Sequence, residues 1–379
     1  MKEQDGINKP FRYLELSTKN GVMKTPFFMP DATRATVRGL LAEDIASWGI
    51  EALVVNTYHL LLQPGCEHIA RLGGIHAFMR WNKPILSDSG GYQVYSLIHK
   101  TGLGKVTEDG VEFRSPVNGS RFFLTPEKSI ELQFQLGVDM MVCLDDPRPN
   151  EAPFEEIEKA VERSIRWALR SKEEYEKQCL IRGLRQGERP LLFGVVQGGT
   201  YRELRKKCVD GLCGLHFDGY GFGARHIDGE GNFLSDIIRY TASILPKDSF
   251  RFALGVGNPS DIVRCIASGW DMFDCVVPTR EGRHGRIFFF TKEEIKWDEN
   301  EKTSWYDTFS VTNHPYADDQ RVLEEGCDCI ACSGGYSRAY IQHLFRSREM
   351  LGPKLATLHN LRFFSRLMEI IAKQKEIVV

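Results

Sequence analysis

Short apolar segments recur along the chain, and each of them runs into polar or glycine residues. Segments of this length with turn-forming residues at their ends are typical of buried parallel strands. Stretches with helical periodicity lie between many of them, at residues 155–177, 201–210 and 259–268. The eight apolar segments are residues 26–29, 52–56, 85–89, 139–145, 191–197, 219–223, 252–256 and 272–277.

Alternation of strands and helices predicts an α/β protein, and eight βα units close into a TIM (β/α)8 barrel. The alternative is a doubly wound open sheet in which some of the apolar segments are not strands. The alternation stops after residue 277, because residues 292–326 are polar and mixed before helical periodicity returns at 336–348. We therefore expect one barrel domain over residues 1–379, with a small subdomain at about 290–360 inserted before a closing helix at 361–374.

The composition narrows the class of protein. With 42% hydrophobic and 26% charged residues, and no apolar run that approaches the length of a membrane span, the chain has the character of a globular protein without a membrane partner. Residues 1–10 are polar and lack the apolar core of a secretion signal, so we expect a cytoplasmic location. The formal net charge is −2, which means that any binding of nucleic acid must use a local basic patch.

Three of the ten cysteines are clustered in the sequence Cys327-Asp-Cys329-Ile-Ala-Cys332. Thiolates at this spacing can share one tetrahedral zinc ion, whereas the alternative is a group of three reduced structural cysteines. A fourth ligand is expected downstream, and both His343 and His359 are candidates that the spacing does not separate. Four protein ligands would make the zinc structural, because no coordination position stays open for a substrate.

Acids and amides stand where predicted strands end, which is where a TIM barrel gathers its chemistry. Asp88 follows the third strand, Asp145 the fourth and Gln197 the fifth, whereas Asp274 lies inside the apolar eighth strand. A carboxylate among apolar residues is costly unless it is paired or functional, so the alternative for Asp274 is a buried ion pair with an arginine. Asp88 could instead cap the turn at the glycines that follow it.

Two acids at one barrel mouth suit glycosidic chemistry, in which one attacks or stabilises the anomeric carbon and the other moves a proton. Tyr92 and Gln93 follow Asp88 closely and suit a flat heteroaromatic base, because a ring can stack on its face and an amide can bind its edge. Asp145 and Gln197 add further hydrogen-bonding groups. Together these residues indicate a purine pocket.

The same residues lie in stretches that resemble the tRNA-guanine transglycosylase family over nearly the whole chain. The matching stretches are Asn56-Thr-Tyr-His59-Leu, Ser87-Asp88-Ser-Gly-Gly-Tyr92-Gln93-Val, Val196-Gln197-Gly-Gly, Gly255-Val-Gly257, Asp271-Met-Phe-Asp274-Cys-Val-Val-Pro-Thr-Arg280-Glu-Gly-Arg283-His-Gly285, the cysteine cluster, Tyr336-Ser-Arg-Ala-Tyr340 and Leu358-His359-Asn360. Their number and order make the resemblance specific.

The resemblance implies a pentosyltransferase that exchanges the wobble guanine of tRNAs with a GUN anticodon for a 7-deazaguanine, in queuosine biosynthesis or salvage. The incoming base would be 7-aminomethyl-7-deazaguanine or queuine. Asp274 would be the nucleophile that forms a covalent aspartyl-ribose intermediate, and Asp88 would be the general acid/base, helped by Asn56.

The resemblance also assigns binding residues and partners. Residues around the base would be Tyr92, Gln93, Asp145, Gln197, Gly223 and Leu254, and those that hold the anticodon RNA would be Arg280 and Arg283, with Arg286 close enough to add a phosphate contact. One structural zinc per chain would be bound by Cys327, Cys329, Cys332 and His359, which leaves His343 as the second choice. We expect the anticodon loop of tRNA and a free 7-deazaguanine base as partners, a homodimer, and no organic cofactor.

The chain departs from the common bacterial pattern at three places around the base pocket. These are Leu144-Asp145-Asp146-Pro147, the stretch Gly223-Ala224-Arg225-His226-Ile227-Asp228-Gly229-Glu230 with one extra residue, and Leu254 in place of a methionine. The resemblance therefore leaves the incoming base open, and Asp146, Asp228 and Glu230 are all candidates to bind its ammonium group.

Three other functions fit part of the pattern. A retaining glycosidase on the same barrel would need the paired acids but not the cysteine cluster. A catalytically silent relative would not need to keep both Asp88 and Asp274. A relative that acts on DNA would keep both aspartates, and only a nucleic-acid competition assay separates it from an enzyme that acts on RNA.

Overall fold

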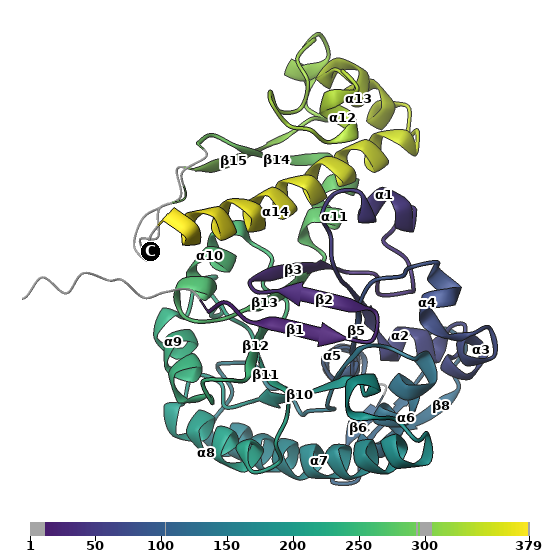
Figure 1. Ribbon diagram of the computed structural model, residues 1–379, viewed down its shortest axis with the longest axis vertical. Coiled ribbons are helices and arrows are strands. Elements are labelled where there is room, and N and C mark those ends of the chain that lie inside the picture. Colours follow the sequence, from purple (N-terminus) through teal and green to yellow (C-terminus); the bar gives the residue numbers. More distant parts are fainter. Residues whose placement is uncertain (1–11, 103, 293–294, 296–304, 378–379) are drawn as a thin grey trace, which may run out of the picture.

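The computed structural model describes residues 12–102, 104–292, 295 and 305–377, and its centre is a sheet of eight parallel strands (Figure 1). The strands run in the order β3-β13-β12-β11-β10-β9-β5-β4. They are β3 (Phe27–Pro30), β4 (Leu53–Asn56), β5 (Ile85–Asp88), β9 (Met140–Val142), β10 (Leu191–Val196), β11 (Gly219–Phe222), β12 (Phe250–Ala253) and β13 (Met272–Cys275). A parallel bridge between Asp31 and Val54 joins the two edges of the sheet, so the predicted barrel is confirmed and the open sheet is wrong.

Each of the eight predicted segments overlaps one of these strands, although their boundaries differ by one to three residues at one end or both. Strand β12 begins at Phe250, two residues before the expected start. Strand β13 ends at Cys275, because Val277 and Pro278 already form the first turn of the next helix, where proline is well tolerated. Asp274 therefore lies one residue from the end of its strand.

Helices surround the barrel, and the three helices expected from periodicity are present as α7 (Phe154–Ile181), α8 (Arg202–Cys213) and α10 (Pro259–Ala267). Between the strands lie also α1 (Ala42–Ala46), α2 (Thr57–Leu62), α3 (Cys66–Arg71), α4 (Gly74–Met79), α5 (Gly91–Thr101), α6 (Pro126–Leu136), a 3-10 turn (Gln186–Glu188), α9 (Ser235–Ile244) and α11 (Val277–Arg283). Within the described residues, no helix combines the length and the apolar character that crossing a membrane requires.

A hairpin that the sequence did not predict covers the amino-terminal end of the barrel. It consists of β1 (Glu15–Thr18) and β2 (Gly21–Lys24), and it inserts Leu16 and Met23 into the apolar barrel interior. Burial of two such side chains contributes about 3–6 kcal/mol relative to leaving them exposed. At the hairpin turn Asn20 donates a hydrogen bond of 2.8 Å from Nδ2 to Oδ1 of Asp139, just before β9. The hairpin thus closes the barrel interior at this end.

A three-stranded sheet, also not predicted, is inserted between α5 and α6. It is formed by β6 (Gly104–Val106), β7 (Val111–Arg114) and β8 (Arg121–Leu124). The turn between β6 and β7 is fastened to α7, because Trp167 donates a hydrogen bond of 2.7 Å from Nε1 to the carbonyl of Glu108.

The C-terminal part packs against the side of the barrel, as Figure 1 shows. It contains the hairpin β14 (Arg286–Phe290) and β15 (Tyr306–Ser310), a 3-10 turn (His314–Tyr316), α12 (Ile330–Ser333), α13 (Arg338–Arg346) and α14 (Leu351–Ile377). Residues 293–294 and 296–304 of the expected polar stretch lie outside the described residues. The closing helix expected from residue 361 begins ten residues earlier, at Leu351, and so includes His359.

Candidate active site

Five of the predicted site residues lie at the carboxyl ends of the barrel strands, where parallel strands present their last side chains to one mouth. Asn56 ends β4 and Asp88 ends β5, and the two residues are paired in the register of these strands. Asp145 and Gln197 follow β9 and β10, and Asp274 lies near the end of β13. The structure therefore brings these residues together, although they are spread over more than half of the sequence.

Asp88 is partly buried and is held by amide groups. Asn56 donates a hydrogen bond of 2.7 Å from Nδ2 to Oδ2 of Asp88, and the backbone N–H of Gly90 lies 3.4 Å from the other oxygen. Burial raises the pKa of Asp88 to about 6, although the hydrogen bonds from Gly90, Gln93 and Asn56 act in the opposite direction and lower it. Asp88 can therefore carry a proton close to neutral pH, as a general acid/base must.

Asp274 accepts a hydrogen bond of 2.8 Å at its Oδ1 from the backbone N–H of Gly255. Burial, together with the negative charges of Asp88 and Asp31, raises the pKa of Asp274 to about 7. No arginine pairs with Asp274 within the described residues, so the alternative of a buried ion pair does not hold. Two acids that repel each other tend to share a proton, which leaves one ionised and one neutral.

Asp145 and Gln197 form one wall of the mouth. Gln197 donates a hydrogen bond of 2.6 Å from Nε2 to Oδ2 of Asp145, while burial raises the pKa of Asp145 to about 7. Gly223 packs against this pair so closely that a Cβ atom there would lie 2.5 Å from Nε2 of Gln197. Leu254 packs on Gly221 in the same way. A Cβ atom at Gly223 would also lie 2.8 Å from the carbonyl oxygen of Val196, so only glycine fits at this position.

Tyr92 and Gln93 begin α5, directly after two glycines. Gly90 has a φ of +86°, and a Cβ atom on Gly91 would lie 2.9 Å from Oδ1 of Asp145. The glycines thus allow the helix to start close to the acids. Gln93 hydrogen-bonds Asp88, whereas the ring of Tyr92 is 54% exposed and free to cover a ligand from the solvent side.

Arg205 supports this wall from behind and was not predicted. Its fully buried guanidinium donates to the carbonyls of Gly199, Val196 and Gly223, at 2.9, 3.0 and 3.1 Å, and stacks on the ring of Phe222. Because these carbonyls belong to the segments that carry Gln197 and Gly223, Arg205 fixes the two segments to each other. Sequence reasoning missed it because a helical arginine is usually exposed.

The predicted RNA-binding arginines lie on one short segment beside the mouth. Arg280 and Arg283 belong to the last turn of α11, and Arg286 begins β14. Arg280 and Arg286 are exposed and line a hollow of about 440 Å³ together with Tyr306 and Asn258. Arg283 is half-buried, and burial together with the nearby Arg38 lowers its pKa. The segment is basic enough to meet a phosphate backbone.

The acids considered for an ammonium group are already engaged or exposed. Asp146 is buried and forms ion pairs with Arg148 and Arg163, at 2.9 and 2.5 Å. Asp228 accepts hydrogen bonds from the backbone of Glu230 and Asn232 within its own turn, and Glu230 is exposed. Asp146 is thus already paired with two cations of the chain.

Asp31 is a further acid at the mouth that the sequence analysis did not single out. It directly follows β3, and its charge raises the pKa of both Asp88 and Asp274. The signal was present in the sequence, because Asp31 follows an apolar strand just as Asp88 does.

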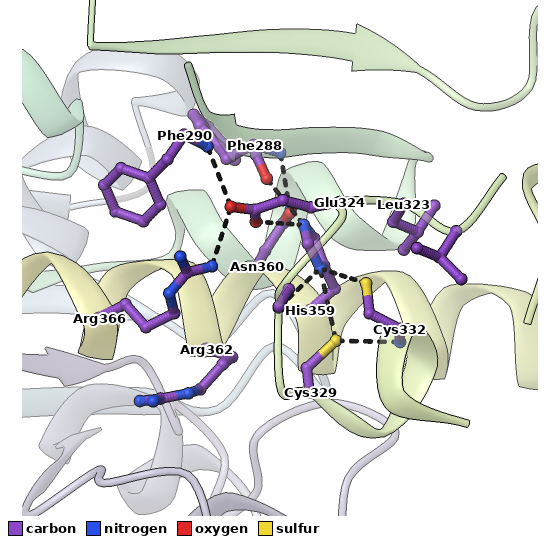
Figure 2. A network of polar contacts seen from close by, with 12 residues as sticks. Phe288, Phe290, Leu323, Glu324, Cys329, Cys332, His359, Asn360, Arg362 and Arg366 are labelled. Atoms are coloured by element: carbon purple, nitrogen blue, oxygen red, sulfur yellow. Dashed lines mark hydrogen bonds and ion pairs between the residues drawn. The ribbon is translucent and has the colours of Figure 1, made fainter. Parts of the chain in front are cut away.

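A second cluster is formed by Cys327, Cys329, Cys332 and His359, all of them buried (Figure 2). Nδ1 of His359 lies 3.7, 3.4 and 3.5 Å from the three sulfurs in sequence order. Bond lengths of about 2.3 Å to sulfur and about 2.0 Å to nitrogen at tetrahedral angles place these atoms about 3.6 Å apart, so the four residues fit one zinc ion. His343 is exposed on α13 and is not part of the cluster.

The surroundings of His359 fix its ring for this purpose. Its Nε2 donates a hydrogen bond of 2.8 Å to the carbonyl of Phe288, which leaves the lone pair of Nδ1 facing the sulfurs. Next to it, the buried side chain of Asn360 accepts from the N–H of Phe288 and donates to the carbonyls of Pro278 and Arg286. Figure 2 shows His359 and Asn360 beside Phe288, together with the ion pair of 2.9 Å between Glu324 and Arg366.

Comparison with known proteins agrees with this geometry. Residues 8–374 match the family model described as queuine tRNA-ribosyltransferase. A queuine tRNA-ribosyltransferase of Thermoanaerobacter pseudethanolicus is 44% identical over 356 residues, which cover 94% of this chain and 88% of the relative. The protein of the same name from Rickettsia typhi is 44% identical over 94% of this chain and 91% of its own length. One from Psychrobacter is 40% identical over 93% of this chain and 87% of its own length.

Proposed function

The chain belongs to the queuine tRNA-ribosyltransferase family and is a pentosyltransferase, and from this premise we propose that it exchanges the wobble guanine of tRNAs with a GUN anticodon for a 7-deazaguanine. The observation that carries the proposal is the convergence of Asp88 and Asp274 at one barrel mouth, beside the amide-lined wall of Asp145 and Gln197. The paired acids can break and re-form the glycosidic bond, and the wall can bind the purine base.

In the first half of the proposed reaction, the ionised carboxylate of Asp274 attacks the anomeric carbon of the ribose. The bond from that carbon to guanine breaks, its electron pair stays with guanine, and Asp88 supplies the proton that neutralises the departing base. The product is an ester between Asp274 and the ribose of the tRNA. The N–H of Gly255 holds the attacking carboxylate in place.

In the second half the incoming base takes the place of guanine. Asp88, now ionised, accepts the proton from the ring nitrogen that attacks the anomeric carbon, and the ester to Asp274 is displaced. Asn56 stabilises the ionised form of Asp88 during this interval, because its Nδ2 donates to Oδ2. The enzyme returns to its starting state with one proton on the pair.

Residues of the wall would orient the bases. Asp145 accepts hydrogen bonds from the exocyclic and ring N–H groups of guanine, Gln197 and the backbone of Gly223 bind the opposite edge, and Tyr92 covers the ring face. Asp146 and Asp228 are engaged elsewhere, so neither favours one incoming base, and the assay below distinguishes 7-aminomethyl-7-deazaguanine from queuine.

We also propose that the metal of the Cys3His cluster is zinc and that its role is structural. All four positions of a tetrahedral ion are filled by the protein, so the metal holds α12 and α14 together and supplies no step of the exchange. The zinc-binding subdomain of about residues 290–360 would thereby be fixed against the barrel.

The proposed tRNA partner would meet the basic segment of Arg280, Arg283 and Arg286. We also propose that the protein forms a homodimer, because the zinc-bearing part of the chain has several exposed apolar side chains. These are Ile330, Tyr340, Met350 and Leu351. Light scattering of the purified protein tests the dimer.

The exchange itself is tested with a tRNA that carries labelled guanine at the wobble position of a GUN anticodon. Incubation with the enzyme and an excess of queuine, or separately of 7-aminomethyl-7-deazaguanine, is expected to release the label with at least one of the two bases. Release with only one base names the substrate. If neither base releases the label, or if the label leaves a DNA duplex instead, the proposal is wrong.

Variants separate the two acids. Asp274→Ala is expected to abolish both the exchange and the covalent adduct with RNA, whereas Asp88→Ala binds RNA but does not turn over. Asp218→Asn is the matched control, since Asp218 is an acid at the opposite end of the barrel, where it accepts a hydrogen bond of 2.8 Å from the N–H of Leu192. An adduct that survives in Asp274→Ala would remove this residue from its proposed role.

A further inference from the structure

Asp31 occupies the seam at which the barrel closes. In the register of β3 and β13, Met29 lies opposite Asp274 and Pro30 opposite Cys275, so Asp31 comes directly after the paired residues. On its other side Asp31 forms the bridge with Val54 of β4, and the N–H of Ala32 donates a hydrogen bond of 2.7 Å to the carbonyl of Val54. Asp31 thus stands between the strand of Asp274 and the strand of Asn56.

The side chain of Asp31 is held at one oxygen and open at the other. Its Oδ1 accepts a hydrogen bond of 2.8 Å from the backbone N–H of Thr33 and a second one from the hydroxyl of the same residue. Among the residues that the structure describes, none forms a hydrogen bond or an ion pair with Oδ2. A carboxylate that is fixed, partly buried and in no ion pair among the described residues keeps its charge effective over its surroundings.

The groups that face the reacting pair belong to every element around the mouth. Donors are Asn56 from β4, Gly90 and Gln93 from the start of α5, and Gly255 after β12, whereas Asp31 adds negative charge from the end of β3. The charge of Asp31 also acts on the cationic Arg283 of α11 and on the ring of His59 on α2, which in addition feels the charge of Arg34. Asp31 is therefore the acid that opposes the donors on both Asp88 and Asp274.

We propose that Asp31 is a positioning residue that keeps one proton on the Asp88–Asp274 pair near neutral pH. The inference rests on the proposed base exchange, in which the pair must hold one proton so that guanine can leave as a neutral base. Two acids of ordinary strength would both be ionised at pH 7, and neither could then donate. The charge of Asp31 disfavours this doubly ionised state, because a third negative charge is repelled by it.

Asp31→Asn tests the proposal, since it removes the charge and keeps the shape and the oxygen that Thr33 binds. Without the third charge both reacting acids become stronger, so the optimum of the pH–rate profile for kcat is expected to move to lower pH, by about half a unit or more. At pH 8 the variant loses kcat relative to pH 6, whereas its KM for tRNA stays the same or falls, because a repulsive charge has been removed from the RNA-binding mouth.

Two further variants isolate the charge from the shape. Asp31→Glu keeps the charge and is expected to keep the optimum of the wild-type enzyme. Thr33→Val removes the hydroxyl that holds Oδ1 but leaves the carboxylate in place, and it serves as the matched control with an unmoved optimum. An optimum that stays in place in Asp31→Asn, or that moves equally in Thr33→Val, overturns the proposal.

A stability measurement tests the same electrostatics without the reaction. Asp88 and Asp274 hold protons in the folded chain that they release on unfolding, so stability falls as the pH rises from about 4 to about 7. Asp31→Asn lowers the pKa of both acids in the folded state, and this fall is expected to be smaller than in the wild-type protein. Urea unfolding at pH 5 and pH 8 measures it. If the wild-type protein exchanges no guanine, the proposed function fails. The role of Asp31 is rejected only if the stability of Asp31→Asn changes between the two pH values as much as that of the wild-type protein.

Discussion

Asn56 and Asp88 face each other across two neighbouring strands, and the amide Nδ2 of Asn56 donates a hydrogen bond of 2.7 Å to Oδ2 of Asp88. The same side chain caps α2, because its Oδ1 accepts from the N–H of His59 at 3.3 Å. One amide is thus oriented by the helix that it caps and offers its donor to the acid. This hydrogen bond lowers the pKa of Asp88, but burial has the larger effect and raises the pKa to about 6.

Replacement of Asn56 by alanine is expected to raise the pKa of Asp88, because the ionised form loses a donor. The acid limb of the pH–rate profile should then move up by about one unit, since the second half of the exchange needs ionised Asp88. Loss of the cap costs about 1 kcal/mol as well. Thr125→Ala, which removes the cap of α6, controls for that loss and should leave the profile unchanged. An acid limb that does not move in Asn56→Ala contradicts the assignment of Asp88.

Asp145 offers a test based on stability. Its pKa in the folded chain is about 7, above the value of 3.8 that applies when it is exposed, so ionising it costs stability. This cost appears as the pH rises above about 4 and is complete above about 7. Asp145→Asn avoids it and is expected to be more stable than the wild-type protein at pH 8, by on the order of 1–2 kcal/mol, and similar to it at pH 4.

Urea unfolding at the two pH values measures this difference. Asp210→Asn, on an exposed acid that pairs with Lys206, should show no such dependence on pH. The stabilised Asp145→Asn variant is expected to lose affinity for guanine, because an amide cannot accept from two N–H groups in the way a carboxylate does. A variant that is no more stable at pH 8 would show that Asp145 is not strained by burial.

Much of this site could be predicted from local sequence. The eight strands are apolar runs bounded by turn residues, and their carboxyl ends necessarily meet at one mouth once the barrel is assumed, so Asp88, Asp145 and Gln197 were found before the structure. The cysteine spacing alone indicated a metal site, but the choice of His359 over His343 needed the resemblance to a family, because both residues follow at helical distance.

What the sequence could not predict depends on contacts between distant segments. Asp146 was a candidate to bind a ligand, but it pairs with Arg163 of α7, seventeen residues further along the chain. The hairpin β1–β2 is too short to stand out from the surrounding polar residues, and its role becomes visible only when Leu16 and Met23 enter the barrel. Asp31 differs from these, because its place after an apolar strand was visible in the sequence, whereas its effect on Asp88 and Asp274 depends on the neighbouring strands.

Removal of a metal ligand should unfold the C-terminal part without touching the mouth. Cys332→Ser is expected to reduce the zinc content from about one ion per chain to a small fraction, and a loss of several kcal/mol corresponds to a fall in Tm of roughly 5–10 °C. Elemental analysis and thermal unfolding measure the two effects. Cys213→Ser, outside the cluster, should keep its zinc. Full zinc content in Cys332→Ser would show that this cysteine is not a ligand.

Asn360 is expected to join the zinc helix to the RNA-binding segment. Asn360→Asp keeps the acceptor for the N–H of Phe288 but replaces two donors by an oxygen that faces the carbonyls of Pro278 and Arg286, which should cost about 2–4 kcal/mol. We expect weaker tRNA binding at temperatures where the variant is still folded. Thr357→Val is the control on the same helix, because the buried hydroxyl of Thr357 has no hydrogen-bond partner within the described residues. Equal tRNA affinity in both variants would show that Asn360 does not couple the zinc-bearing helix to the RNA-binding segment.

The basic segment can be tested through the salt dependence of binding. Each phosphate contact to a single-stranded region contributes a slope of about 0.7 to the plot of log affinity against log salt, because bound counterions are released. Arg280→Gln and Arg283→Gln should therefore each weaken tRNA binding and reduce this slope by roughly that amount. Arg185→Gln, on an exposed arginine far from the mouth in sequence, should change neither quantity. Arg283 is half-buried next to Arg38 and Arg280, so its removal also relieves repulsion among these cations, and its loss of affinity should be smaller than that of Arg280. An unchanged slope in both variants would place the RNA elsewhere on the surface.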